Sequence, residues 1–179
     1  MKKQLKTFIL LLILLGCSCV SFDQPQEIVY LIPQGFTGGV IVAYDQPDGV
    51  TPEIREDGTT YYPIPKDGLL RVTTPYPEKV ISYSCFYADE NGQQTQIEYI
   101  MPQGSAPSPP GVPLRRLNDL NEEEKNNGIF AMNHRRIGFE QNKQNNPVHA
   151  FSIGHPKDSR SLYLRSLDRL SEFEKMIQK

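Results

Sequence analysis

Short runs of β-branched and aromatic residues, separated by tight-turn dipeptides, fill residues 27 to 101. The runs are Ile28–Ile32, Val40–Tyr44, Thr59–Ile64, Leu69–Thr73, Val80–Ala88 and Thr95–Met101. The dipeptides are Asp48-Gly49, Asp57-Gly58, Asp67-Gly68 and Asn91-Gly92, in which glycine adopts positive φ freely beside a residue that tolerates it. Within residues 27 to 101, the apolar residues do not follow the three- to four-residue spacing of a helix. The pattern predicts a mainly β protein, an antiparallel β-sandwich or small barrel.

Two of these runs indicate where their strands lie in a sheet. Val40–Tyr44 is apolar at every position, which is typical of a central strand covered on both faces. In Thr95–Met101, polar and apolar residues alternate at first, which favours a half-exposed strand.

The N-terminus has the features of an export signal. Three lysines, at positions 2, 3 and 6, precede an apolar stretch over residues 7–15. That stretch is too short to cross a bilayer as a helix, which takes roughly 20 apolar residues. It ends in Leu14-Leu15-Gly16-Cys17, which resembles the lipobox of bacterial lipoproteins. The resemblance implies a signal peptide at 1–16 and a lipid-modified Cys17.

Two other interpretations of this end stay open. The segment could be a plain signal peptide that is cut nearby, or Cys17 could stand by chance in a short apolar helix. Cys19 is a poorer acceptor, because Cys17 would then lie two residues before the cut and no leucine stands at the required distance. With acylation at Cys17, the protein is anchored to a membrane of the cell envelope and faces away from the cytoplasm. Each buried methylene of the acyl chains contributes about 0.8 kcal/mol, and two or more chains hold a protein durably.

Charge argues against nucleic acid as a partner. The full chain has 19 basic and 21 acidic residues, and the predicted cleavage removes three lysines. Binding to phosphates requires clustered lysine and arginine. The pairs Arg115-Arg116 and Arg135-Arg136 are too isolated to form such a surface.

The rest of the chain divides by composition. Residues 17–26 read as a polar tether and 27–101 as the β core, while 102–113, with five prolines, reads as an extended loop or linker. Residues 114–179 form a mixed segment. A short helix is expected over 114–128, ending at Gly128. A strand or a hairpin is expected at Ile129–Phe139 and one more strand at Val148–Ile153.

A C-terminal amphipathic helix is expected to follow. Asp158 or Ser159 can cap it. Its expected apolar face consists of Leu164, Leu167, Leu170, Phe173 or Glu174, and Ile177. We expect this face to lie against the sheet.

A family resemblance rests on the segment Tyr30-Leu31-Ile32-Pro33-Gln34-Gly35-Phe36-Thr37-Gly38-Gly39-Val40-Ile41-Val42 and on Tyr62-Pro63-Ile64-Pro65-Lys66-Asp67-Gly68. These residues resemble a family of uncharacterised bacterial secreted proteins and lipoproteins, a domain of unknown function. Their order is also similar to transthyretin-like and carboxypeptidase-regulatory-like sandwich modules. The resemblance implies a sandwich with a binding or structural role and carries no activity.

Histidines and loop carboxylates are the candidates for a metal site. His149 and His155 could approach one another with Asp158 or Glu140, but their spacing matches no zinc motif. Carboxylates at strand ends, Asp45, Asp48, Asp57, Asp67 and Asp89, fit Asx turns better than a calcium loop. No metal or cofactor is predicted.

Nucleophile patterns are absent as well. Cys85 lies in an apolar run, no G-x-S-x-G or phosphate-cradling glycine motif occurs, and no catalytic residue is predicted. A disulfide between Cys19 and Cys85 is possible but not favoured. The tyrosine-rich runs could expose a stacking face, although core packing is the commoner role of such rings.

Two functions follow from these features. The favoured one is an envelope-anchored, non-enzymatic binding or structural module, whose partner is an envelope protein or an extracellular ligand. The alternative is a secreted hydrolase or metal-dependent enzyme that uses His134, His149 or His155 with the loop aspartates.

Overall fold

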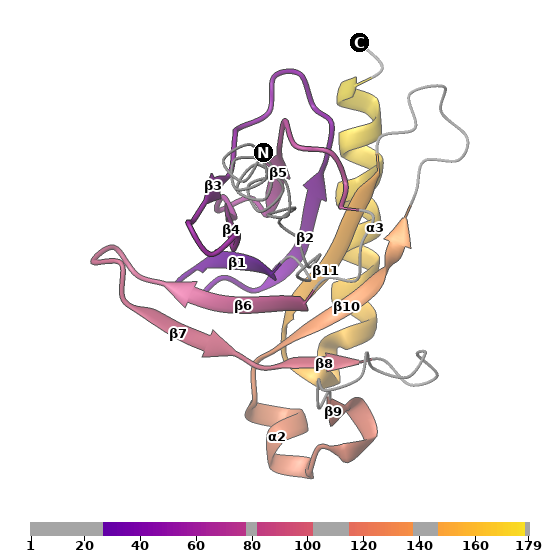
Figure 1. The fold of residues 1–179 in the computed structure, drawn as a ribbon. Helices are drawn as coiled ribbons and strands as arrows, with labels where there is room; N and C mark the ends of the chain where they lie inside the picture. The colour runs from indigo at the N-terminus through magenta and orange to yellow at the C-terminus, as the bar shows by residue number, and fades with distance from the viewer. Residues whose placement is uncertain (1–26, 78–81, 102–114, 138–146, 178–179) are drawn as a thin grey trace, which may run out of the picture.

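The computed structural model describes residues 27–77, 82–101, 115–137 and 147–177, which form two mixed sheets and a C-terminal helix (Figure 1). Sheet A has the order β3-β4-β1-β6-β7. Its strands are β1 (Glu27–Pro33), β3 (Glu53–Ile54), β4 (Thr60–Pro63), β6 (Ser82–Ala88) and β7 (Gln94–Ile97).

Sheet B has the order β5-β2-β11-β10-β8-β9. Its strands are β2 (Gly38–Ala43), β5 (Leu69–Arg71), β8 (Tyr99–Met101), β9 (Arg115–Arg116), β10 (Phe130–Ile137) and β11 (Val148–Gly154). The helical elements are η1 (Leu117–Asp119), α2 (Glu122–Asn127), η2 (Pro156–Asp158) and α3 (Ser159–Ile177). The prediction of a mainly β protein with a C-terminal helix is confirmed.

The prediction that the strands run antiparallel is wrong for about half of the pairings. β1 runs parallel to both β4 and β6, and β2 runs parallel to β5. The reason is that only two of the four turn dipeptides close hairpins, β3-β4 at Asp57-Gly58 and β6-β7 at Asn91-Gly92. The chain changes sheet at Asp48-Gly49 and at Asp67-Gly68, so strands that follow one another in sequence do not pair there.

The two sheets share one buried cluster. Sheet A contributes alternate residues, such as Ile28, Tyr30 and Ile32, and sheet B contributes Val40, Val42 and Phe151 among others. Alternation along each strand places these side chains on one face, as a layered β core requires. β2 is buried at all six positions, which confirms the prediction of a central strand there.

α3 covers the other face of sheet B. It packs along β2 and β11, where Leu170 and Phe173 meet Ile41, Ala43 and Val148. The predicted face of this helix was wrong in part, since the side chain of Leu164 is 51% exposed while Leu162 and Ser166 are buried. A Cβ added at Gly39 would lie 2.4 Å from Ser166 Oγ and 2.8 Å from Ser166 Cα, so two small residues let helix and strand approach.

Two elements of the structure differ in extent from the sequence prediction. The helix predicted over 114–128 is limited to Glu122–Asn127, because the Asn121 side chain accepts a hydrogen bond from Glu124 N and starts the helix there. It ends at Gly128 as predicted. The run Thr95–Met101 is split at Glu98, where the chain passes from sheet A to sheet B.

In the described part of the chain, no helix has the length and apolar character needed to cross a membrane. Residues 1–26, including Cys17 and Cys19, lie outside the described residues, as does the whole proline-rich segment up to residue 114.

Candidate functional site

The structure places the predicted histidines in different surroundings. His149 lies on β11 and is 3% exposed, with Nδ1 at 2.6 Å from Tyr30 Oη. His155 follows β11, and its Nδ1 lies 2.9 Å from the carbonyl oxygen of Gly128. His134 lies on β10, where its backbone pairs with Ala150. Among the described side chains, those of residues 27–77, 82–101, 115–132 and 147–175, no three histidine, cysteine or acidic groups gather as metal ligands do.

Three of the loop aspartates form Asx turns, as predicted. Oδ1 of Asp57 accepts from Thr59 N at 2.9 Å, Oδ1 of Asp67 from Leu69 N at 3.0 Å, and Oδ1 of Asp89 from Asn91 N at 2.9 Å. The hydrogen bond from Thr59 N lowers the pKa of the Asp57 carboxyl. Asp48 instead pairs with Arg71, and Asp45 adopts a φ of 56° after β2.

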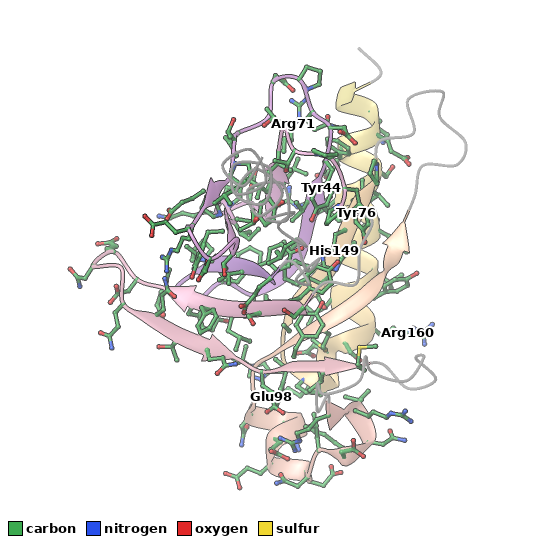
Figure 2. All side chains as sticks on the ribbon, in the orientation of Figure 1. Tyr44, Arg71, Tyr76, Glu98, His149 and Arg160 are labelled. Carbon is green, nitrogen blue, oxygen red and sulfur yellow. The ribbon has the colours of Figure 1, made fainter. Side chains whose placement is uncertain are left out.

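The tyrosines are mainly core residues, which confirms the commoner of the two roles considered. Tyr30, Tyr44 and Tyr62 are buried between the sheets, and the Tyr30 ring stacks on those of Tyr62 and Tyr83. Figure 2 shows His149, Tyr44 and Tyr76 in this interior, with Arg71 apart from them beside the loop that follows β2. Burial raises the pKa of Tyr30 and of Tyr44.

Cys85 belongs to the same interior. It lies on β6 with 1% of its surface exposed, and burial raises the pKa of its thiol. A buried thiol that is held protonated is a poor nucleophile. The apolar run around Cys85 therefore has a packing role.

An open groove of about 530 Å³ lies between the β5 edge of sheet B and the β3-β4 edge of sheet A. Three sequence segments line it. The first comprises Asp48, Val50, Thr51 and Glu53, the second Tyr61, Pro63 and Pro65, and the third Leu69, Leu70 and Arg71, with Leu31 added from β1. Apolar side chains supply most of this lining, as is usual in ligand-binding clefts. We call it the β3–β5 groove.

The loop 45–51 closes one end of the groove by wrapping around β5. Gln46 N donates to Val72 O at 2.9 Å, and Val50 N donates to Arg71 O at 2.8 Å. Between these two bonds the loop passes directly over Val72. A Cβ at Gly49 would lie 2.6 Å from the Val72 backbone, so glycine is required at the crossing.

Arg71 supplies the cation of the groove and is held by two partners. Nη1 donates to Asp48 Oδ2 at 2.6 Å, and Nη2 contacts Asp48 Oδ1 and donates to Gln46 Oε1 at 3.4 Å. Gln46 is itself buried and donates from Nε2 to Tyr44 O at 2.8 Å. The guanidinium is therefore fixed at the groove wall by a paired carboxylate and a buried amide.

The groove was not among the predicted sites, because its lining comes from four separate segments of the sequence. Two features of the sequence point to it in retrospect. Pro63 and Pro65 lack a backbone donor and so occur at sheet edges, and Val50 is an apolar residue in a polar loop. In the structure Val50 is 50% exposed and Ile54 on β3 is 60% exposed, so this corner presents apolar surface to solvent.

Comparisons with known proteins give a family and no activity. No curated protein matches the chain. Among solved structures, the crystal structure of a candidate lipoprotein from Bacillus anthracis is similar, with 15% sequence identity, a TM-score of 0.48, and coverage of 70% of this chain and 68% of that one. A model of a family of unknown function matches residues 24–134, more than half of the chain. This span includes the segment from Tyr30 to Gly68 that first indicated such a family, and the chain belongs to this family of unknown function, DUF6843.

Proposed function

We propose that this protein is an extracytoplasmic lipoprotein, anchored at Cys17, whose folded part is a non-enzymatic binding module of the β-sandwich class. The single observation that carries the binding role is the β3–β5 groove, an apolar cleft with a fixed cation at an open corner of two sheets. The lipobox-like Leu14-Leu15-Gly16-Cys17 supports the anchor. The buried cluster shared by both sheets supports a sandwich, and its transthyretin-like character rests on the sequence order from Tyr30 to Gly68 alone.

The arrangement of reactive groups favours binding over catalysis. The lining of the groove contains no histidine or cysteine, and its arginine is paired with Asp48. His149 and His155 each contact a protein group in a different part of the fold, Tyr30 and Gly128 respectively. The alternative of a secreted hydrolase or metal-dependent enzyme therefore gains no support from their positions.

The anchor is tested by cell fractionation of the full chain in a bacterial host. We expect the protein in the membrane fraction, with a mature N-terminus at position 17 that carries acyl chains in mass spectra. Cys17→Ala should leave the protein uncleaved or release it from the membrane, while the matched Cys19→Ala should remain acylated and membrane-bound. An intact Met1, or a free thiol at position 17 in native material, would exclude this part of the proposal.

The binding role is tested by site-specific photocrosslinking in intact cells. A photoreactive residue at Val50 lies at the groove, and one at Leu164 lies on α3 with nearly the same exposed fraction, 50% against 51%. We expect a discrete adduct from position 50 and none of the same mass from position 164. Equal, diffuse labelling from both positions would show that the groove has no specific occupant.

A further inference from the structure

The outer edge of β5 is occupied at its C-terminal end, where Val50 forms a parallel bridge with Val72, and its preceding residues present further main-chain groups. Ile41 N donates to Gly68 O at 2.8 Å, and Val72 N donates to Ala43 O at 2.9 Å. In a parallel ladder, bonds to one neighbour are made by alternate residues, so Leu70 bonds to β2 while Leu69 and Arg71 direct their N–H and C=O groups away from it. These outward groups face the side on which the groove lies.

Only part of that outward set has a partner among the described residues. Leu69 N donates to the Asp67 carboxylate at 3.0 Å, and Arg71 O accepts from Val50 N at 2.8 Å. No described residue bonds to Leu69 C=O or to Arg71 N–H. An acceptor and a donor, two residues apart on one strand edge, match the groups that an added strand offers.

The groove provides room for the side chains of such a strand. Its volume of about 530 Å³ is bounded by the same residues, Leu69 to Arg71, and by Val50, Tyr61 and Pro63 opposite them. In strand addition, main-chain hydrogen bonds give affinity, and pockets for alternate side chains give specificity. An apolar residue directed into the groove is thus the natural complement of the free edge.

The charge of the protein surface beside the groove indicates which residues the bound segment should carry. The segment from residue 45 to 57, which includes β3, carries five exposed carboxylates, Asp45, Asp48, Glu53, Glu56 and Asp57. Two arginines oppose them, Arg55 within the segment and Arg71 on β5, so the corner has an excess of negative charge. Fields of one sign attract ligands of the other sign and repel like surfaces. A basic segment is therefore favoured, and pairing with a second copy of this acidic corner is disfavoured.

We propose that the β3–β5 groove binds an extended peptide segment of another protein, which adds as a strand to the free edge of β5 and alternates apolar side chains with lysine or arginine. This inference rests on the proposed binding function and specifies its ligand. It is separable from the anchor, because the peptide is tested against the folded domain in solution.

The direct test measures binding of synthetic peptides to the purified chain without its signal segment, by fluorescence anisotropy. The probe is an eight-residue peptide that alternates valine with lysine or threonine. One comparison peptide replaces its lysines with glutamate, and another carries N-methyl groups on the amides that face β5. We expect saturable binding of the lysine peptide, weakened by salt, and at least about tenfold weaker binding of both comparison peptides.

Variants at position 71 isolate the main-chain bond. Arg71→Ala and Arg71→Pro both remove the guanidinium, but only proline also removes the outward N–H, and proline is tolerated at strand edges. We expect Arg71→Pro to bind the lysine peptide about fivefold more weakly than Arg71→Ala at equal thermal stability. The N-methylated peptide gives the same information if Arg71→Pro does not fold.

Several results would overturn the proposal. They are equal binding of the N-methylated and unmodified peptides, a preference for the glutamate peptide, and absence of saturable binding by any peptide. Concentration-dependent dimers that are disrupted by Val50→Glu, or binding to anionic lipid vesicles in place of peptide, would assign the groove to a second copy or to a membrane. If Cys17 acylation is confirmed while the peptides fail, the anchor stands and the ligand is of another class.

Discussion

Tyr30 Oη lies 2.6 Å from His149 Nδ1, and this contact joins the two sheets, because Tyr30 is on β1 of sheet A and His149 is on β11 of sheet B. Tyr44 Oη, from β2, lies 3.4 Å from the same hydroxyl. Removal of one partner from a buried hydrogen bond leaves the other with its full desolvation penalty. The interior between the sheets thus depends on polar contacts as well as on apolar packing.

We expect Tyr30→Phe to lower the free energy of unfolding by about 1–2 kcal/mol, since it removes the hydroxyl that meets His149. Urea denaturation followed by circular dichroism measures the change. Tyr61→Phe is the matched control, because the half-buried Tyr61 ring lies beside Arg55 and its hydroxyl bonds to none of the described residues, so a change under about 0.5 kcal/mol is expected. Equal losses in both variants would show that the Tyr30–His149 contact contributes nothing specific.

The buried tyrosines predict loss of stability in alkali. Burial raises the pKa of Tyr30, Tyr44 and Tyr62 above the ordinary value of about 10. Above that pH the unfolded chain releases phenolic protons that the folded chain keeps, so the unfolded state binds fewer protons and stability falls as pH rises. Each such tyrosine lowers the free energy of unfolding by up to about 1.4 kcal/mol per pH unit.

Absorbance at the phenolate band, recorded together with circular dichroism from about pH 9 upward, tests this expectation. Part of the tyrosine titration should coincide with unfolding. Complete ionisation of all tyrosines while the fold persists would contradict it.

Docking of α3 should depend on Phe173 and not on Leu164. Phe173 is fully buried against Ile41 and Val148, so Phe173→Ala should destabilise the fold by about 3–5 kcal/mol. Leu164 is on the same helix but is half exposed, so Leu164→Ala should change stability by less than about 0.5 kcal/mol. Chemical denaturation of both variants measures the difference. Similar losses would place Leu164 in the contact with the sheet.

The approach of α3 to β2 should fail when Gly39 gains a side chain. Gly39→Ala places a Cβ 2.8 Å from Ser166 Cα, which is backbone and cannot rotate away, so a loss of about 2 kcal/mol or more is expected. Ser166→Ala removes only a hydroxyl that donates to Leu162 O within its own helix, and should cost less than about 1 kcal/mol. Thermal unfolding compares the two. If Gly39→Ala left the stability unchanged, the helix would be free to shift outward.

The sequence predicted the elements better than their pairing. Alternation and β-branched composition located β1, β2, β4, β5 and β6 within a few residues. The direction of pairing was not predictable, because an Asp-Gly dipeptide has the same local conformation whether it closes a hairpin, as at Asp57-Gly58, or leads to the other sheet, as at Asp67-Gly68. Which of these occurs is decided by long-range burial.

The exposed face of α3 and the groove escaped prediction for a related reason. Leucine spacing alone favoured a stripe through Leu164, but the close crossing at Gly39 rotates the helix so that Ser166 faces the sheet. The groove requires Val50, Tyr61 and Arg71 to meet, and these residues come from a loop, sheet A and sheet B. Local patterns contain no information on such a junction. The Asx turns at Asp57, Asp67 and Asp89 were predictable because each needs only the next few residues.

β11 comes last in sequence among the described strands, yet it lies between β2 and β10 in the middle of sheet B. Until residues 148–154 have been synthesised, β2 and β10 have no neighbour on that side, and the strands before β11 cannot complete sheet B. Assembly of sheet B must therefore wait for residue 154, and any product that ends before β11 exposes two unsatisfied backbone ladders to aggregation or proteolysis.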